Sequence, residues 1–146
     1  MAGVKDFDAE IKETQVYKPQ TTTADQNSAS VNMTGYNSVA FYALLGATGD
    51  TLSGSIKWEF ELEESVDDSA WTDVPNAKML DTVTGTNVGT FAVVDANTED
   101  ETVYVGQYIG SAKFVRCVIN ATGTHTNGTP IAILAMQSKA DVYPVA

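Results

Sequence analysis

Alternation of apolar and polar positions dominates the chain from about residue 30 onward. In the clearest stretch, charged residues separate four large apolar ones, Ile56, Trp58, Phe60 and Leu62. A period of two places successive side chains on opposite faces of a β-strand. No stretch keeps the three-and-four spacing of an amphipathic helix over the length of a helix. About eight short strands separated by turn sequences therefore predict an all-β domain.

Two regions indicate how these strands are arranged. Residues 39–45 are apolar at every position, which predicts a central strand covered on both faces. Two long strands, residues 113–121 and 129–139, follow near the C-terminus, and a glycine-rich loop containing Asn127-Gly128 joins them. Such a loop favours a hairpin. We expect an antiparallel β-sandwich of jelly-roll or Greek-key type, with an open barrel as the alternative.

The N-terminal stretch differs from the rest of the chain. Residues 1–28 hold one short apolar cluster, followed by a polar run rich in threonine. Such a composition buries too little apolar surface to fold by itself. We therefore expect an extended N-terminal arm over residues 1–28 and a β-sandwich domain over residues 29–146, with a floppy terminus as the competing interpretation of the arm. The residues expected to contact a partner are Val16, Tyr17, Lys18 and Pro19.

Charge excludes two classes of partner. The chain has 19 acidic and 8 basic residues, a formal net charge of -11. Nucleic-acid binding relies on a basic face, and an anionic membrane repels an acidic protein, so we expect neither partner. No segment reaches the roughly 20 apolar residues that cross a bilayer, and the N-terminus lacks an apolar stretch of signal-peptide length. These features predict a soluble protein that is synthesised in a cytoplasm.

The chain is poor in residues that carry chemistry. A single cysteine, Cys117, lies in an apolar run and is expected to be a small buried side chain. The single histidine, His125, lies in the glycine-rich loop and is expected to be solvated, without the partner that a general base needs. The sequence leaves a Ser-His-Asp arrangement open but lacks the spacing of a nucleophile elbow. We expect no catalytic residue, no cofactor and no metal, and hence no enzyme.

Acidic residues were the remaining candidates for a metal or catalytic site. The loop from Asp95 to Glu101 offers oxygen ligands for Ca²⁺, but it lacks the ligand spacing and glycine of an EF-hand, which favours a solvated loop. Glu59, Glu61 and Glu63 alternate along one strand. Paired carboxylates occur in glycosidases, but here strand alternation accounts for them, and they are expected to face outward.

Two segments together resemble a known family. The first, residues 57–74, contains Leu62-Glu63-Glu64-Ser65, an Asp-rich turn and then Trp71-Thr72-Asp73-Val74; the second is residues 105–118. They are similar to small head proteins of tailed bacteriophages, in which a later strand reads Tyr-x-Gly-x-x-Arg-Tyr-Val-Arg-Val. The resemblance covers most of the chain from Ser30 onward. It implies a capsid decoration or cement protein, a β-sandwich without catalytic residues that sits on an icosahedral shell and braces neighbouring capsomers.

The expected function is accordingly that of a structural virion protein on the capsid exterior. The resemblance implies two partners, the major capsid protein and neighbouring copies of the chain itself in a small oligomer such as a trimer. Two alternatives stay open. One is a glycan- or receptor-binding module, which exposed aromatic residues would favour, and the other is a tail or head-completion protein. The aromatic residues in question are Tyr36, Tyr104 and Tyr108.

Overall fold

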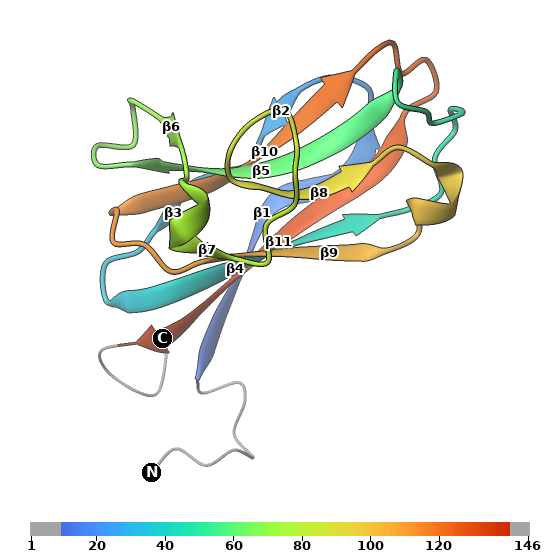
Figure 1. The fold of residues 1–146 in the computed structure, drawn as a ribbon. Coiled ribbons are helices and arrows are strands. Elements are labelled where there is room, and N and C mark those ends of the chain that lie inside the picture. The colour runs from blue at the N-terminus through green and yellow to red at the C-terminus, as the bar shows by residue number, and fades with distance from the viewer. Residues whose placement is uncertain (1–9, 141–146) are drawn as a thin grey trace.

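The computed structural model describes residues 10–140, which form two antiparallel β-sheets packed face to face (Figure 1). This confirms the predicted all-β sandwich. The five-stranded sheet has the order β1 (Ile11–Thr22), β11 (Thr129–Ala140), β4 (Tyr36–Leu45), β9 (Val103–Tyr108) and β7 (Met79–Leu80). The six-stranded sheet has the order β2 (Gln26–Asn27), β10 (Phe114–Thr122), β5 (Lys57–Ser65) and β6 (Thr72–Asp73). Its two further strands are β3 (Val31–Asn32), which pairs with β10, and β8 (Thr90–Val94), which pairs with β5. Single 3₁₀ turns are η1 (Asn76–Lys78) and η2 (Asn97–Glu99).

The core lies between the sheets and is built from alternate residues of the long strands. Phe41 on β4 and Ile133 on β11 face Trp58, Phe60 and other fully buried residues of the opposite sheet. Apolar burial of this kind is the main favourable term in folding. The prediction for Cys117 is confirmed, because it is a free, buried residue of β10. Burial raises the pKa of its thiol, so it remains protonated.

Over its described part, the predicted arm contains a long strand of the sandwich, β1. β1 pairs with β11 from Ile11, opposite Ser138, to Thr22, opposite Thr129. A bulge between Gln15 and Tyr17 breaks the alternation, and both Val16 and Tyr17 are buried, with exposed fractions of 6% and 8%. The composition of residues 1–28 gave no sign of this, because β11 supplies the hydrogen-bonding partner from the far end of the chain. Residues 1–9 of the arm and 141–146 of the domain lie outside the described part.

The connection between β10 and β11 is not a hairpin, although its sequence favours one. β10 belongs to the sheet of β5, whereas β11 pairs with β1 and β4, so the loop crosses between the two sheets. Gly123 and Gly128 both have positive φ there, and a Cβ on Gly123 would lie 2.2 Å from the carbonyl oxygen of Ser55. The glycines therefore serve a tight crossover rather than a two-stranded turn.

The glutamates of β5 are also placed differently from the prediction. Glu59 and Glu61 do lie on the outer face of the strand, but each is only 2% exposed. The segment between β7 and β8 covers them. Thr86 donates its backbone N–H and its hydroxyl to the Glu59 carboxylate at 2.7 and 2.8 Å, and Asn87 donates to Glu61 at 3.1 Å. Alternation gave the correct face, but it carries no information about a loop folded over that face.

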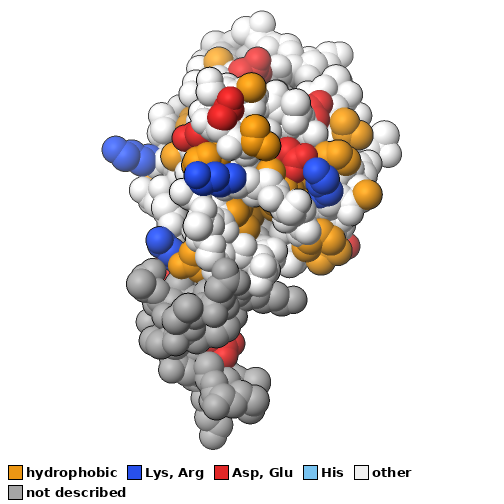
Figure 2. Space-filling view, turned by 90° about the vertical axis from the view of Figure 1, so that its left-hand side faces the viewer, with side chains coloured by type: hydrophobic (Ala, Val, Ile, Leu, Met, Phe, Trp, Pro, Cys, Tyr) orange, Lys and Arg blue, Asp and Glu red, His pale blue; other side chains and the backbone are white. Residues whose placement is uncertain are grey.

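Charged side chains of both signs meet at the end of the sandwich where β5 turns into β6. Figure 2 shows this end, with basic side chains set among acidic and hydrophobic ones. Lys78 bonds Glu64 at 2.8 Å, and Arg116 bonds Glu63 at 2.6 Å. The Arg116 guanidinium also lies 4.4 Å from the centre of the Trp71 ring. These contacts tie the β5–β6 turn to β10.

Candidate protein-binding surface

The outer face of the five-stranded sheet carries three adjacent rows of outward-facing residues. The strand register places Leu44 of β4 between Ala132 of β11 and Val103 of β9. The next row has Tyr42 at its centre, and the third has Ala40. Side chains directly opposite on paired strands are close enough to touch. We call the following residues the apolar outer face: Ala40, Tyr42, Leu44, Val103, Val105, Ala132, Leu134 and Met136.

These side chains are open to solvent rather than covered. Leu44 is 41% exposed, Val103 52% and Val105 42%, and the other members are partly exposed. The prediction that the strand at residues 39–45 is covered on both faces is therefore wrong for its outer face. Single exposed apolar residues are common, but a contiguous exposed group on one sheet is typical of a surface that binds another protein. The apolar outer face is the candidate site.

The predicted contact residues divide between the core and the rim of this face. Val16 and Tyr17 are buried within the chain, whereas Lys18 and Pro19 are exposed. Pro19 lines a shallow hollow of about 220 Å³ together with Leu44, Pro130 and Ala132. The structure thus brings one predicted residue, Pro19, to the apolar outer face. The face itself was missed, although the two-sided apolar pattern of residues 39–45 was its signal.

The tyrosines considered for glycan binding do not form an exposed group. Tyr108 is fully buried, donates its hydroxyl to Glu64 at 2.6 Å, and accepts the N–H of Ala112 at 2.9 Å. Burial and the hydrogen bond to Glu64 both raise its pKa. Tyr104 is half-buried and donates to the carbonyl of Glu99 at 2.6 Å. Both hydroxyls are therefore engaged within the protein.

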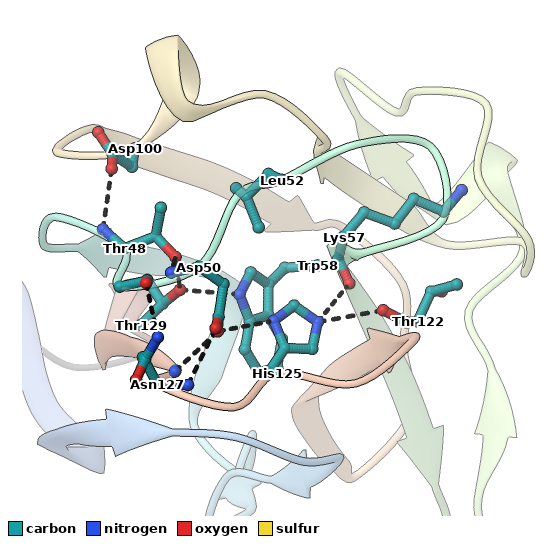
Figure 3. Close-up of polar contacts among 12 residues, drawn as sticks. Thr48, Asp50, Leu52, Lys57, Trp58, Asp100, Thr122, His125, Asn127 and Thr129 are labelled. Carbon is teal, nitrogen blue, oxygen red and sulfur yellow. Dashed lines mark hydrogen bonds and ion pairs between the residues drawn. The ribbon is translucent and has the colours of Figure 1, made fainter.

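His125 is buried, which corrects the prediction of a solvated loop residue (Figure 3). Its ring stacks on Trp58 with the ring centres 4.0 Å apart. Its Nε2 lies 3.2 Å from the carbonyl oxygen of Lys57 and 3.1 Å from that of Thr122. Carbonyl oxygens only accept, so Nε2 carries the proton and donates. Nδ1 faces Asp50, 3.7 Å from its Oδ2.

The contacts of His125 and Asp50 join the β4–β5 loop to the β10–β11 loop instead of forming a catalytic centre. Asp50 accepts the backbone N–H groups of Asn127 at 2.9 Å and Gly128 at 2.8 Å. Trp58 donates to Thr129 at 3.0 Å, which in turn donates to Thr48 at 2.8 Å. The His125 side chain has an exposed fraction of 0%, so it offers no nitrogen to a substrate. The cluster is structural, and it fixes one end of the sandwich.

Asp50 gives this cluster a dependence on pH. Hydrogen bonds from the backbone, that of Asn127 foremost, lower its pKa against the opposing effect of burial. The pKa of Asp50 is lower in the folded than in the unfolded protein. The carboxylate therefore stabilises the fold at pH values above the usual aspartate pKa, and this contribution is lost as the pH falls through the folded pKa.

We expect Asp50→Asn to lower the free energy of unfolding by roughly 1–2 kcal/mol near neutral pH, with a smaller difference from wild type in acid. Asn127 and Gly128 donate to different oxygens of Asp50, and asparagine keeps only one oxygen. Urea denaturation of both proteins at a series of pH values measures the difference. The exposed Asp95→Asn serves as the control. A difference between wild type and Asp50→Asn that is the same at every pH would contradict the assignment.

Comparison with models of known protein families finds none that matches the chain, and a search of curated proteins finds no match. Within residues 10–140, no helix has the length and apolar character needed to cross a membrane.

Proposed function

We propose that this chain is a structural virion protein that binds the outer surface of a phage capsid through its apolar outer face. The single observation that carries the proposal is that face, formed by β11, β4 and β9 and left exposed. The resemblance of residues 57–74 and 105–118 to phage head proteins supplies the partner, the major capsid protein. Contacts with neighbouring copies of the chain, as in a trimer, belong to the same proposal.

The character of the face suits a protein partner. Across β11, β4 and β9 the three rows hold one polar residue, Gln107, and no charged one, whereas the neighbouring strand β1 adds Gln15 and Glu13 at the edge. Cores of protein interfaces are likewise depleted in charge and their rims are polar. A standard interface buries roughly 800 Å² on each partner. The eight exposed or partly exposed residues of the apolar outer face would form the centre of such an interface, without a deep pocket. Affinity for a shell would then come from area and shape complementarity.

The two resembling segments meet in space. Trp71, from the first, lies against the guanidinium of Arg116, from the second, and Arg116 bonds Glu63. Asp67 accepts the N–H groups of Ser69 and Ala70 at 3.0 and 2.9 Å and so shapes the turn. These residues hold the β5–β6 turn in place. In this proposal they have a structural role, and the apolar outer face meets the capsid.

The net charge of -11 is consistent with an external position. Packaged DNA would repel an acidic protein on the inside of a shell, whereas on the outside the shell wall separates the two. The same charge keeps a highly expressed protein soluble before assembly.

The test is to mix the full chain with capsids assembled from the major capsid protein of the same genome. We expect the chain to sediment with the capsids, to saturate at a fixed ratio to capsid subunits, and to appear on the outer surface by cryo-electron microscopy. A bound shell is also expected to withstand higher temperature than a bare one. Absence of co-sedimentation would overturn the proposal. A few copies confined to the neck or tail would instead identify a tail or head-completion protein.

A further inference from the structure

Three carboxylates converge on the outer face of the six-stranded sheet, away from the apolar outer face. Glu61 and Glu63 follow each other on the same side of β5, and Asp73 of β6 pairs with Glu63 in the strand register. One ligand oxygen from each residue lies within 4.8 Å of the others. Like charges this close repel, so the arrangement calls for a compensating positive charge.

One of the three side chains is buried with an unused oxygen. Glu61 is 2% exposed, and its Oε1 accepts both amide donors, from Asn120 at 2.9 Å and from Asn87 at 3.1 Å. Its Oε2 is buried and has no hydrogen-bond partner. Buried polar atoms are nearly always paired, since an unpaired one costs the free energy of its lost hydration. That oxygen can therefore serve as a ligand for a cation.

Neighbouring basic residues compensate the cluster only in part. Arg116 bonds Glu63 through Nη2 at 2.6 Å and Nε at 2.7 Å, both to Oε2. Lys57 pairs with Glu59, and Lys78 pairs with Glu64. With all three carboxylates ionised, the single guanidinium leaves two negative charges at the cluster, which is the charge that a divalent cation neutralises.

We propose that Glu61, Glu63 and Asp73 form a Ca²⁺ site. Oxygen-only ligands suit Ca²⁺ and Mg²⁺, whereas Zn²⁺ favours nitrogen and sulfur. Ca²⁺ accepts flexible, irregular arrangements of oxygen ligands, whereas Mg²⁺ demands near-ideal octahedral geometry. Three carboxylates fixed on two neighbouring strands therefore suit Ca²⁺ better than Mg²⁺. Binding joins β6 to β5 and, through Asn87 on Glu61, holds the segment that covers β5.

The experiment uses the full chain freed of metal with a chelator. Thermal unfolding is followed with added Ca²⁺ or Mg²⁺, and Tb³⁺ luminescence is excited through tryptophan, because Trp71 contacts Arg116 and Arg116 bonds the ligand Glu63. The variants are Glu61→Gln and Asp73→Asn, and the control is Asp95→Asn, which removes an exposed carboxylate elsewhere. Glutamine keeps the Oε1 acceptor and the volume of Glu61. Asp73→Asn alters a less buried side chain. If either variant fails to fold, the other still tests the proposal.

The expected result is a rise in the melting temperature with Ca²⁺ at roughly 10⁻⁴–10⁻³ M, with little response to Mg²⁺. Each ligand variant is expected to weaken Ca²⁺ binding by about tenfold or more and to lose the Tb³⁺ signal, while the control binds like wild type. The proposal is overturned if wild type shows neither response, if both ligand variants respond like wild type, or if the control loses binding equally. It stands independently of capsid binding, since every readout is made on the isolated chain.

Discussion

Replacing Trp58 with alanine is expected to lower the free energy of unfolding by roughly 3–5 kcal/mol. Trp58 is the largest fully buried side chain, and its loss removes apolar contacts and leaves a cavity between the sheets. It also removes the stack on His125 and the hydrogen bond to Thr129. The two loops that meet around His125, β4–β5 and β10–β11, would then lose their shared support. Both core packing and the end of the sandwich are affected by one substitution.

The measurement is urea denaturation followed by circular dichroism, because tryptophan fluorescence changes with the substitution itself. Trp58→Phe is the informative companion. It keeps an aromatic ring against His125 and loses the indole N–H but only part of the side-chain volume. It should therefore lower the free energy of unfolding clearly less than alanine does. Thr129→Val removes the acceptor of the indole N–H together with the hydrogen bond from Thr129 to Thr48, and it should cost about 1–2 kcal/mol, since the indole donor is buried. A loss below about 1 kcal/mol in Trp58→Ala would show that this end of the sandwich repacks freely.

The sequence predicted those parts of the fold that are visible in local patterns. Alternation placed Trp58, Phe60 and Leu62 on one inward face, and all three are fully buried. Cys117, within an apolar run, is buried as expected. In each case the burial of a residue depends on which face of its own strand it occupies, and period two reports this directly.

The errors arise where a distant segment decides the environment. The His125 ring is buried against Trp58, and its Nε2 donates to the carbonyl of Lys57, 68 positions earlier in the chain. The polar residues next to His125 in the sequence give no sign of these contacts. β1 is a strand because β11 pairs with it, although most of its own side chains are polar and exposed. Glu61 is buried because Asn87 and Asn120 reach it. Such contacts follow from tertiary structure, and they override local composition.

The apolar run at residues 39–45 does not specify what covers each face of its strand. Residues 39–45 are apolar on both faces, and this indicates a strand with two apolar sides. It does not say whether the second side meets another layer of the same chain or a different molecule. The structure leaves Leu44 and its neighbours exposed. A partner molecule, rather than a second layer of this chain, is therefore the candidate to cover this face.

Introducing lysine at Leu44 and Val105 together is expected to weaken capsid binding by roughly 100-fold or more. The two residues stand in adjacent rows near the middle of the apolar outer face. A partner covering that face would have to bury two unpaired ammonium groups, which is costly because it strips their hydration. The free protein should tolerate the change within about 1 kcal/mol, because both positions are already more than 40% exposed. Binding is measured by co-sedimentation with capsids, and stability by urea denaturation.

A matched control separates loss of the apolar outer face from the added positive charge. Val66 and Val88 are apolar residues with exposed fractions of 79% and 53%, and they lie outside the face. The double lysine variant at these positions changes the net charge by the same amount, so a purely electrostatic effect on an acidic protein would appear in both pairs. We expect the control to bind capsids like wild type. Equal weakening in the two pairs would assign binding to overall charge, and no weakening in either would place the contact elsewhere on the sandwich. Only selective loss in the Leu44 and Val105 pair supports the sheet face as the surface that meets the shell.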